Sequence, residues 1–287
     1  MKQAFLIVAH KNFEQTKLLI EFIADDHHHV YVHIDQKNDE MFNQLKQYFQ
    51  SFHTVFFLEQ RMSINWGGLS QVLVTIELLK KAISGNYDFY HLISGQDLFI
   101  KSKKDVSSFL EKNKGRQFLE VKKNQDYWRI KGYYLFSDSK YNRTRPVNMI
   151  NHLLSKFYKK FPFRPNFKGY ELYKGANWFT LSGDCVEYLL NYLKEHPKYM
   201  KDYKYTICAD EHFFQTLILN SPFKDTVINN TLREIQWNGG PNPKTYTVED
   251  YQFLCESEAL FARKFDSEFD NDIIKKVYHY IKGKRVI

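Results

Sequence analysis

The chain has 287 residues, a hydrophobic fraction of 43% and a formal net charge of +8 at pH 7. This length accommodates one large or two small domains with a real core. The basic balance, with a pI near 9.1, favours an anionic partner: a nucleic acid, a phospholipid surface or a phosphorylated metabolite. No apolar run is long enough to span a membrane and the N-terminus turns polar too early for a secretory signal, so we expect a cytoplasmic protein.

The cysteines give no sign of a disulfide framework or a zinc site. Cys185, Cys208 and Cys255 lie far apart in the sequence and form no C-x-x-C pattern. We therefore expect reduced and mostly buried thiols.

The first 110 residues alternate strand-like and helix-like segments. Continuous apolar runs predict buried strands, and apolar residues at i, i+3, i+4 and i+7 predict helices. The alternation predicts βαβ units, and hence an α/β protein with a mostly parallel central sheet and helices on both faces. The expected strands are 4–10, 29–35, 54–59 and a fourth that begins at 88 and runs into a loop by 100, and the expected helices are 16–24, 38–50 and 69–83.

Ligands of such sheets bind beyond the carboxyl ends of the strands. His10, Asp35 and Asp97 each follow or end a predicted strand, where they are either strand-end caps or ligand contacts. The turn 66–68, Trp-Gly-Gly, precedes a predicted helix; it is either a simple turn or a place where a phosphate or sugar approaches backbone N–H groups. It matches neither the Rossmann nor the P-loop fingerprint.

Residues 123–170 are basic, aromatic and poor in clear periodicity. This composition suits a nucleic-acid face or a cleft for a carbohydrate or lipid-phosphate acceptor, and the lack of an RNP, KH or zinc-finger signature favours the cleft. Beyond it we expect a strand at 177–182, a helix at 184–196 and a strand with a turn at 232–240. The basic amphipathic tail 271–287 is expected either to contact an anionic membrane or to form a solvated helix.

The stretch 207–218 begins with Asp210-Glu211-His212 and continues as an apolar run. A metal site, a proton-transfer site and an acidic first turn of a helix are the alternatives. From this stretch alone the acidic first turn is favoured, because the helix macrodipole stabilises carboxylates there.

A series of short fragments, in this order and at these intervals, resembles the Core-2/I-branching enzymes and peptide O-xylosyltransferases, the family 14 glycosyltransferases, in a short bacterial-type form. The fragments, which span roughly residues 4–266, are VAH, VHID, SINWGGLS, HLISGQDLFIK, GANWFTLS, ADEHFF, LREIQW and ALFARKFD. The resemblance implies a GT-A-like nucleotide-sugar fold and an inverting transfer from a UDP-sugar to a hydroxyl of a glycan or lipid-linked saccharide. It also implies that no cofactor and no divalent metal is needed. In this arrangement residues 1–110 form the UDP-binding half and residues 111–270 the acceptor-binding and catalytic half.

Metal-dependent GT-A enzymes carry a D-x-D motif after the fourth strand, where this chain has Gly95-Gln96-Asp97. The literal D-x-D at 270–272 lies near the C-terminus and is interpreted as a surface turn. Without a metal, fixed cations must stabilise the leaving diphosphate. Arg263 and Lys264 match the family's diphosphate-binding pair by position, and Lys244 is a further candidate after a shortened loop.

Under the same resemblance Glu211 falls on the catalytic base, which must lie within hydrogen-bond reach of the attacking hydroxyl. Asp210 is then expected to cap the helix, and His212 to pack or to hold a neighbour. The acceptor-binding residues implied are Glu120, Arg129, Lys131 and Trp237. The donor-binding residues expected are Ala9, His10, Asp35, Trp66, Asp97, Lys244, Arg263 and Lys264.

The sequence leaves one rival hypothesis from a different class. A non-catalytic protein could use the basic aromatic surface to bind RNA or anionic lipid. For the transferase hypothesis no nucleic acid is expected as a partner, and the product is expected to be a surface polysaccharide.

Overall fold

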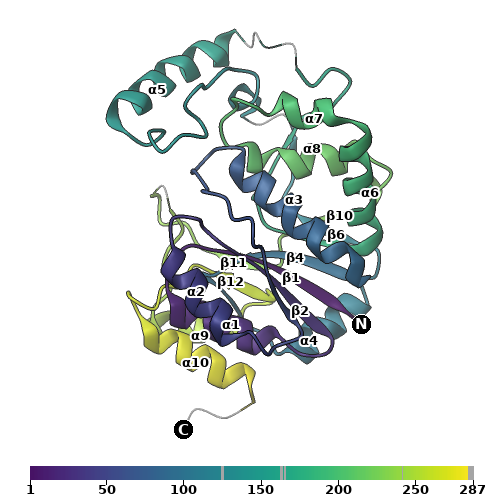
Figure 1. Cartoon of the computed structure of the whole chain (residues 1–287), viewed down its shortest axis with the longest axis vertical. Helices are drawn as coiled ribbons and strands as arrows, with labels where there is room; N and C mark the ends of the chain where they lie inside the picture. The colour runs from purple at the N-terminus through teal and green to yellow at the C-terminus, as the bar shows by residue number, and fades with distance from the viewer. Residues whose placement is uncertain (124–125, 162–163, 165, 241, 284–287) are drawn as a thin grey trace. The chain divides into compact units, whose positions relative to one another are not determined.

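The computed structural model of the chain describes residues 1–123, 126–161, 164, 166–240 and 242–283 (Figure 1). It forms two compact units: Met1–Leu58, Tyr87–Lys114 and Leu232–Ile287 make unit 1, and Glu59–Asn86 and Gly115–Thr231 make unit 2. These boundaries differ from those expected at positions 110 and 270. Residues 59–86 belong to unit 2 together with residues 115–231, and residues 232–270 belong to unit 1 together with the N-terminal strands. The functional roles of the two expected halves stay predictions.

Unit 1 contains parallel strands in the order β4-β1-β2-β3. They are β1 (Gln3–Ala9), β2 (His28–Ile34), β3 (Val55–Phe57) and β4 (Phe89–Ser94). Helices α1 (Phe13–Ile23) and α2 (Asp39–Tyr48) follow β1 and β2 along the chain. The α/β class and the mostly parallel sheet expected from the sequence are therefore confirmed.

The segment 88–100, expected as a strand running into a loop, contains two strands, β4 and β5 (Asp97–Phe99). Gly95 donates its N–H to Val8 O at 3.1 Å, and a Cβ on this glycine would lie 2.8 Å from Ala9 Cβ. The close approach ends β4 beside the end of β1, and β5 (Asp97–Phe99) begins two residues later.

β5 belongs to a second, small sheet of unit 1. β12 (Phe261–Arg263) pairs antiparallel with β5 and parallel with β11 (Arg233–Ile235). The register sets Arg263 opposite Asp97, so residues far apart in the sequence meet near the carboxyl end of β4.

The remaining helices of unit 1 are α4 (Lys103–Glu111), α9 (Tyr251–Glu256) and α10 (Asn271–Ile281). α10 confirms the helix expected in the tail, and it packs against α9 and β5. Its apolar side is buried, through Ile273, Ile274, Val277, Tyr278 and Ile281. That side packs within unit 1, and contact of the tail with a membrane stays a prediction; residues 284–287 of the tail lie outside the described residues.

In the part of unit 2 that the structure describes, short strands combine with five α-helices. β6 (Gln117–Leu119) pairs parallel with β10 (Val227–Asn229) and antiparallel with β9 (Phe179–Ser182), and β7 (Lys122–Lys123) pairs with β8 (Tyr173–Lys174). The helices are α3 (Ser70–Ala82), α5 (Arg145–Lys160), α6 (Gly183–Glu195), α7 (Pro197–Asp202) and α8 (Phe213–Leu219). The sequence patterns predicted α3, α6 and β9 but not α5, because most apolar side chains of α5 lie outside its narrow buried side.

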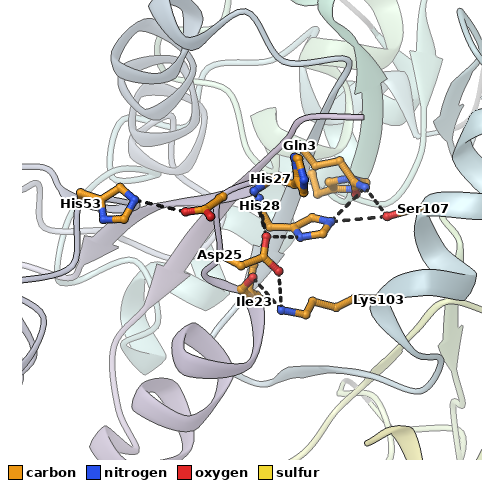
Figure 2. Close-up of polar contacts among 10 residues, drawn as sticks. Gln3, Ile23, Asp25, His27, His28, His53, Lys103 and Ser107 are labelled. Carbon is orange, nitrogen blue, oxygen red and sulfur yellow. Dashed lines mark hydrogen bonds and ion pairs between the residues drawn. The ribbon is translucent and has the colours of Figure 1, made fainter.

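A polar network lies at the amino ends of β1 and β2 (Figure 2). The Asp25 carboxylate accepts from Lys103 Nζ at 2.6 Å and from His28 Nδ1 at 2.7 Å. On its far side the His28 ring meets Gln3 Nε2 at 3.3 Å, and Gln3 Oε1 accepts from His91 Nε2 at 3.1 Å. This network joins β1, β2 and β4 to helix α4.

Cys185 and Cys208 are buried and Cys255 is half-buried, all as free thiols, as the sequence predicted. Within the described part of the chain, no helix combines the length and the apolar composition needed to cross a bilayer.

Candidate functional site

The carboxyl ends of β1 and β2 are tied together by backbone contacts. Asp35 donates its N–H to Ala9 O at 2.9 Å, and Asn38 donates its side-chain amide to His10 O at 3.1 Å. The Asp35 carboxylate is buried; it accepts from the N–H of Lys37 at 2.9 Å and forms an ion pair with the Lys37 ammonium at 3.4 Å. Asp35 therefore acts at least as a strand-end cap, and its contact with a donor stays a prediction.

Asp97 is held by two arginines. Arg263 Nη1 lies 2.7 Å from Oδ1, and Arg233 Nε lies 3.3 Å from Oδ2. The Asp97 side chain is only 1% exposed, so its charge serves to orient the two guanidinium groups. Arg263 also contacts Ser94 at the end of β4. Asp97 occupies the place where metal-dependent GT-A enzymes carry the D-x-D motif, and here its carboxylate fixes the Arg263 guanidinium. Direct contact of Asp97 with a donor sugar stays a prediction.

Three basic side chains, which we call the strand-end cations, gather beyond β1, β4 and β12: Lys11, Arg263 and Lys264. Lys11 Nζ pairs with Asp266 at 2.6 Å. Within the described residues, Lys264 has no ion-pair partner. Burial and the nearby charges of Lys11 and Arg263 lower the pKa of Lys264, against the opposing effect of Asp266. An anion that bound here would relieve this repulsion.

His10 lies among the same charges. Partial burial and the charges of Lys11, Arg263 and Lys264 lower its pKa, and Asp35 opposes them. The imidazole is therefore neutral at pH 7 and supplies a hydrogen-bonding group without adding charge.

Two further residues of unit 1 expected in the site are placed differently. The Lys244 ammonium forms an ion pair with Asp250, whose other oxygen accepts the N–H of Thr247 at 2.9 Å before helix α9. Its charge is thus already partnered. Trp237 is exposed in the loop after β11 and is accessible to a sugar ring. Both assignments stay predictions.

The D-x-D at 270–272 is a helix cap. Asp270 Oδ1 accepts from the N–H groups of Asp272 and Ile273 at 2.9 and 3.1 Å, and Oδ2 accepts from Val248 at 2.9 Å. The surface-turn interpretation is corrected to an N-cap of α10. Within the described residues, no group of His, Cys, Asp and Glu side chains is arranged to hold a metal ion.

In unit 2, Glu211 lies in a 3-10 turn, η3 (Ala209–Glu211), ahead of α8. Its Oε2 accepts from Arg129 Nη1 at 2.7 Å and lies 3.4 Å from Lys174 Nζ. Asp126 completes the cluster, 2.7 Å from Lys174. Both cations bind the same oxygen, and within the described residues Glu211 Oε1 has no hydrogen-bond partner. The side chain is 29% exposed, so Oε1 is open to a ligand.

A short segment connects Glu211 to Glu120. Gly175 donates its N–H to Glu211 O at 2.8 Å, and Ala176 donates its N–H to Glu120 Oε2 at 2.8 Å. A Cβ on Gly175 would lie 1.8 Å from Glu120 O, so only glycine fits between these backbones. The structure thus brings the expected base, Arg129 and Glu120 together in one unit.

The neighbours of Glu211 differ from expectation in one respect. Asp210 does not cap α8, because η3 intervenes and the N-cap residue is His212, whose side chain makes no capping bond. Burial and the adjacent charge of Glu211 raise the pKa of Asp210 to about 7. His212 is buried and donates Nδ1–H to Tyr173 O at 3.0 Å, which confirms that it holds a neighbour. Burial lowers its pKa to about 3.

Lys131 and Trp66 have separate roles in unit 2. Lys131 Nζ donates to Asn166 O at 2.6 Å, and the structure shows no contact between Lys131 and Glu211. Trp66 is exposed, with the Arg143 guanidinium 5.4 Å from its ring centroid. At the start of α3, Asp138 accepts the N–H of Ser70 at 3.0 Å, so a protein carboxylate already occupies this helix N-terminus. Trp66 remains a prediction as a stacking residue.

Sequence reasoning missed Lys11, Lys174, Asp126 and Arg233. Lys11 directly follows the VAH fragment and Lys174 directly precedes GANWFTLS. Their positions beside these fragments were the available signal. Asp126 and Arg233 reach their partners only through tertiary contacts over 48 and 136 positions of sequence, which no local pattern reveals.

The fold and these charged groups define an α/β protein with cations beyond its strands and an anchored carboxylate with one open oxygen. Residues 3–254 match the family model described as Core-2/I-Branching enzyme. The chain belongs to this family.

The relatives are longer proteins. The chain is 22% identical over 304 residues to xylosyltransferase 2 of Rattus norvegicus, covering 98% of this chain and 34% of that protein. It is 25% identical over 307 residues to xylosyltransferase 1 of Homo sapiens, covering 98% and 30%. The chain thus spans about a third of the length of these curated relatives. The solved structure of mannose-6-phosphate isomerase from Helicobacter pylori overlaps 70% of this chain and 78% of its own, with 15% identity and a TM-score of 0.35, too low to bear on function.

Proposed function

We propose that the protein is an inverting glycosyltransferase. It moves a sugar of the GlcNAc, xylose or galactose type from a UDP-sugar to a hydroxyl of a glycan or lipid-linked saccharide, in the cytoplasm and during surface polysaccharide synthesis. Family membership and the xylosyltransferase relatives support the transferase class. The observation that carries the mechanism is Glu211, whose Oε2 is anchored by cations while Oε1 is open.

Glu211 is proposed as the base. The acceptor hydroxyl donates its hydrogen bond to Oε1, and its oxygen attacks the anomeric carbon on the face opposite the diphosphate. As the new carbon–oxygen bond forms, the hydroxyl proton moves to Glu211 and the bond from the anomeric carbon to the phosphate oxygen breaks. Arg129 and Lys174 hold the carboxylate in one orientation, which keeps the open oxygen available.

The strand-end cations are proposed to bind the diphosphate. The leaving UDP carries away the electron pair of the broken bond, and Arg263 and Lys264 stabilise the resulting charge in place of a divalent metal. The support is that Asp97 fixes Arg263 and that the Lys264 ammonium has no ion-pair partner within the described residues. Glu120 and Trp237 are proposed to contact the acceptor.

The test is UDP release from UDP-GlcNAc, UDP-Gal, UDP-Xyl and UDP-Glc in the presence of candidate saccharide acceptors and EDTA. Glu211→Gln keeps the shape of the side chain but loses the base, so we expect the turnover rate to fall about 100-fold or more, with unchanged affinity for UDP. Glu187→Gln, on the exposed side of α6, is the matched control and should keep full activity. Full activity of Glu211→Gln, or loss of wild-type activity on chelation, would contradict the proposal.

A further inference from the structure

One helix of unit 2 carries an apolar side that the described protein does not cover. α5 is attached through a narrow buried side made by Val147, Asn151 and Tyr158. Its exposed apolar side chains are Met149 (64% exposed), Ile150 (43%), Leu153 (60%) and Phe157 (52%). Soluble monomers rarely leave such a continuous apolar patch in water unless it binds a partner.

Positive charge accompanies these apolar side chains. Between Asp138 and Glu171 the sequence contains no acidic residue. The basic residues of this interval are Lys140, Arg143, Arg145, Lys156, Lys159, Lys160, Arg164 and Lys168. No carboxylate in the described residues pairs with those of α5. The partner of this surface is therefore expected to carry negative charge.

The helix geometry sets most of the cations beside the apolar side chains, with one exception: Lys160 falls between Met149 and Leu153. At 3.6 residues per turn, Met149, Leu153 and Phe157 fall on one side of α5. Arg145, Lys156 and Lys159 fall on the adjacent side, away from the buried one. A helix with an apolar stripe flanked by cations has the pattern of one that lies in the interface of an anionic membrane, with its apolar side at the boundary of the headgroups and acyl chains.

We propose that this surface, which we call the α5 face (Met149, Ile150, Leu153, Phe157, Lys156, Lys159 and Lys160), docks the protein on an anionic lipid bilayer. Each exposed lysine adds attraction to acidic headgroups, and the apolar side chains enter the bilayer surface. The other basic amphipathic helix of the chain, α10, differs because its apolar side is buried in unit 1.

Two other occupants fit the α5 face less well. A nucleic acid is bound through aromatic rings that stack on bases, whereas three of the four apolar side chains of the α5 face, Met149, Ile150 and Leu153, are not aromatic; only Phe157 could stack. A second copy of the chain across a two-fold axis would set the same surface against itself. The basic surface of one copy would then face the basic surface of the other, with no acidic residue between Asp138 and Glu171 to compensate.

The α5 face is connected to the Glu211 cluster within unit 2. α5 packs against the 3-10 turn η2 (Tyr127–Arg129), and Lys159 Nζ lies 4.9 Å from the ring centroid of Trp128. The next residue, Arg129, binds Glu211. The α5 face and the proposed base are thus linked through η2, which favours a lipid-linked acceptor. This last consequence rests on the proposed function, whereas the docking does not.

The experiment is flotation of the full chain with two kinds of vesicle, phosphatidylcholine alone and phosphatidylcholine mixed with phosphatidylglycerol. We expect binding to the mixed vesicles and weak binding to the neutral ones. The variants Leu153→Ser/Phe157→Ser and Lys156→Glu/Lys160→Glu should each weaken binding about tenfold or more. All four side chains are exposed, so thermal unfolding and UDP affinity should match wild type.

Matched controls test the location of the surface. Phe269→Ser removes an aromatic side chain of unit 1 that is more exposed than Phe157, and Lys282→Glu reverses a charge at the end of α10; both should bind as wild type. Glu211→Gln should also bind vesicles normally, which separates failure of docking from failure of the proposed chemistry.

The proposal is overturned if wild type ignores anionic vesicles, if both α5 variants bind as well as wild type, or if Lys282→Glu causes the same loss. It is also overturned if single-stranded RNA, or a dimer of the chain, is the interaction that the α5 variants abolish.

Discussion

The parallel strands of unit 1 carry clusters of charged side chains at both their amino and their carboxyl ends. The two clusters differ in how completely their charges are paired within the protein. At the amino ends, Asp25 binds both Lys103 and His28, and the network continues to Gln3 (Figure 2). At the carboxyl ends, two arginines share Asp97, and Lys264 has no ion-pair partner within the described residues. The amino-end network is complete without a ligand, whereas the carboxyl-end group has an excess of positive charge.

This difference separates structural from functional charge. Charges that stabilise a fold are matched by partners in the protein, because an unmatched and partly buried charge costs free energy. An unmatched group persists where a ligand supplies the missing charge, and for this family member a diphosphate is the proposed ligand. The two ends of the strands should therefore respond oppositely to mutation.

The largest effect is expected for Lys264→Ala. Removing a charge-assisted contact worth about 1.5–3 kcal/mol should weaken UDP binding about 10- to 100-fold. Because Lys11 and Arg263 repel Lys264 in the free protein, the free energy of unfolding should change by less than about 0.5 kcal/mol. Titration calorimetry with UDP and urea unfolding measure the two quantities.

Lys103→Ala is the counterpart at the amino ends. It removes an ion pair of 2.6 Å with Asp25, so it should lower the free energy of unfolding by about 1 kcal/mol and leave UDP affinity unchanged. If both variants lost UDP affinity equally, or if Lys264→Ala were the less stable of the two, the distinction between the two ends would be wrong.

A second pair of variants sharpens the comparison within the amino-end network. Asp25→Ala removes a carboxylate that accepts from Lys103, from the ring of His28 and from the N–H of His27 at 2.9 Å. We expect a loss of about 1–2 kcal/mol in the free energy of unfolding. The next residue, Asp26, pairs at 3.4 Å with His53, and both side chains are more than 80% exposed.

Asp26→Ala is therefore the matched control, with an expected change below about 0.5 kcal/mol. Urea unfolding at pH 7 measures both variants. Equal losses in the free energy of unfolding for Asp25→Ala and Asp26→Ala would show that the amino-end network stabilises the protein no more than an exposed ion pair does.

The sequence predicted the strands of the parallel sheet, because buried strands have continuous apolar runs. It also placed candidate site residues near the carboxyl ends of these strands, where ligands of parallel sheets bind, and their role stays a prediction. It predicted Glu211 through the family resemblance. It did not predict which oxygen of Glu211 is anchored, since Arg129 and Lys174 approach it from distant segments.

Two amphipathic helices show the same limit. α10 was predicted from its pattern, but the pattern does not say whether the apolar side meets the protein or a membrane. α5 was missed, because its exposed apolar side chains spread the signal over more than one side of the helix. Which apolar surface is covered depends on tertiary packing, and the hydrophobic periodicity of a single segment does not predict that packing.

The smallest effect is expected in the pH dependence of stability, for which His91 and His10 are the pair to compare. Burial, with Arg233 and His28 nearby, lowers the pKa of His91 well below its ordinary value. The folded protein thus keeps His91 neutral, whereas the unfolded chain binds a proton below pH ~6.5. The contribution of His91 is complete above that pH and is lost as the pH falls towards the folded pKa. The slope for one such histidine is about 1.4 kcal/mol per pH unit.

Urea unfolding at pH 7, 6 and 5 measures this slope for wild type and for His91→Gln, which keeps an amide donor for Gln3 Oε1. Between pH 6 and 5 the stability of His91→Gln should fall less than that of wild type by about 1 kcal/mol. Part of the slope persists, because burial also lowers the pKa of His28, and that of His212 to about 3. His10→Gln should change the slope less than His91→Gln, because His91 is completely buried whereas His10 is only partly buried. A larger change for His10→Gln would contradict this prediction. It would mean that protonation destabilises unit 1 at the carboxyl ends of the strands and not at the amino-end network.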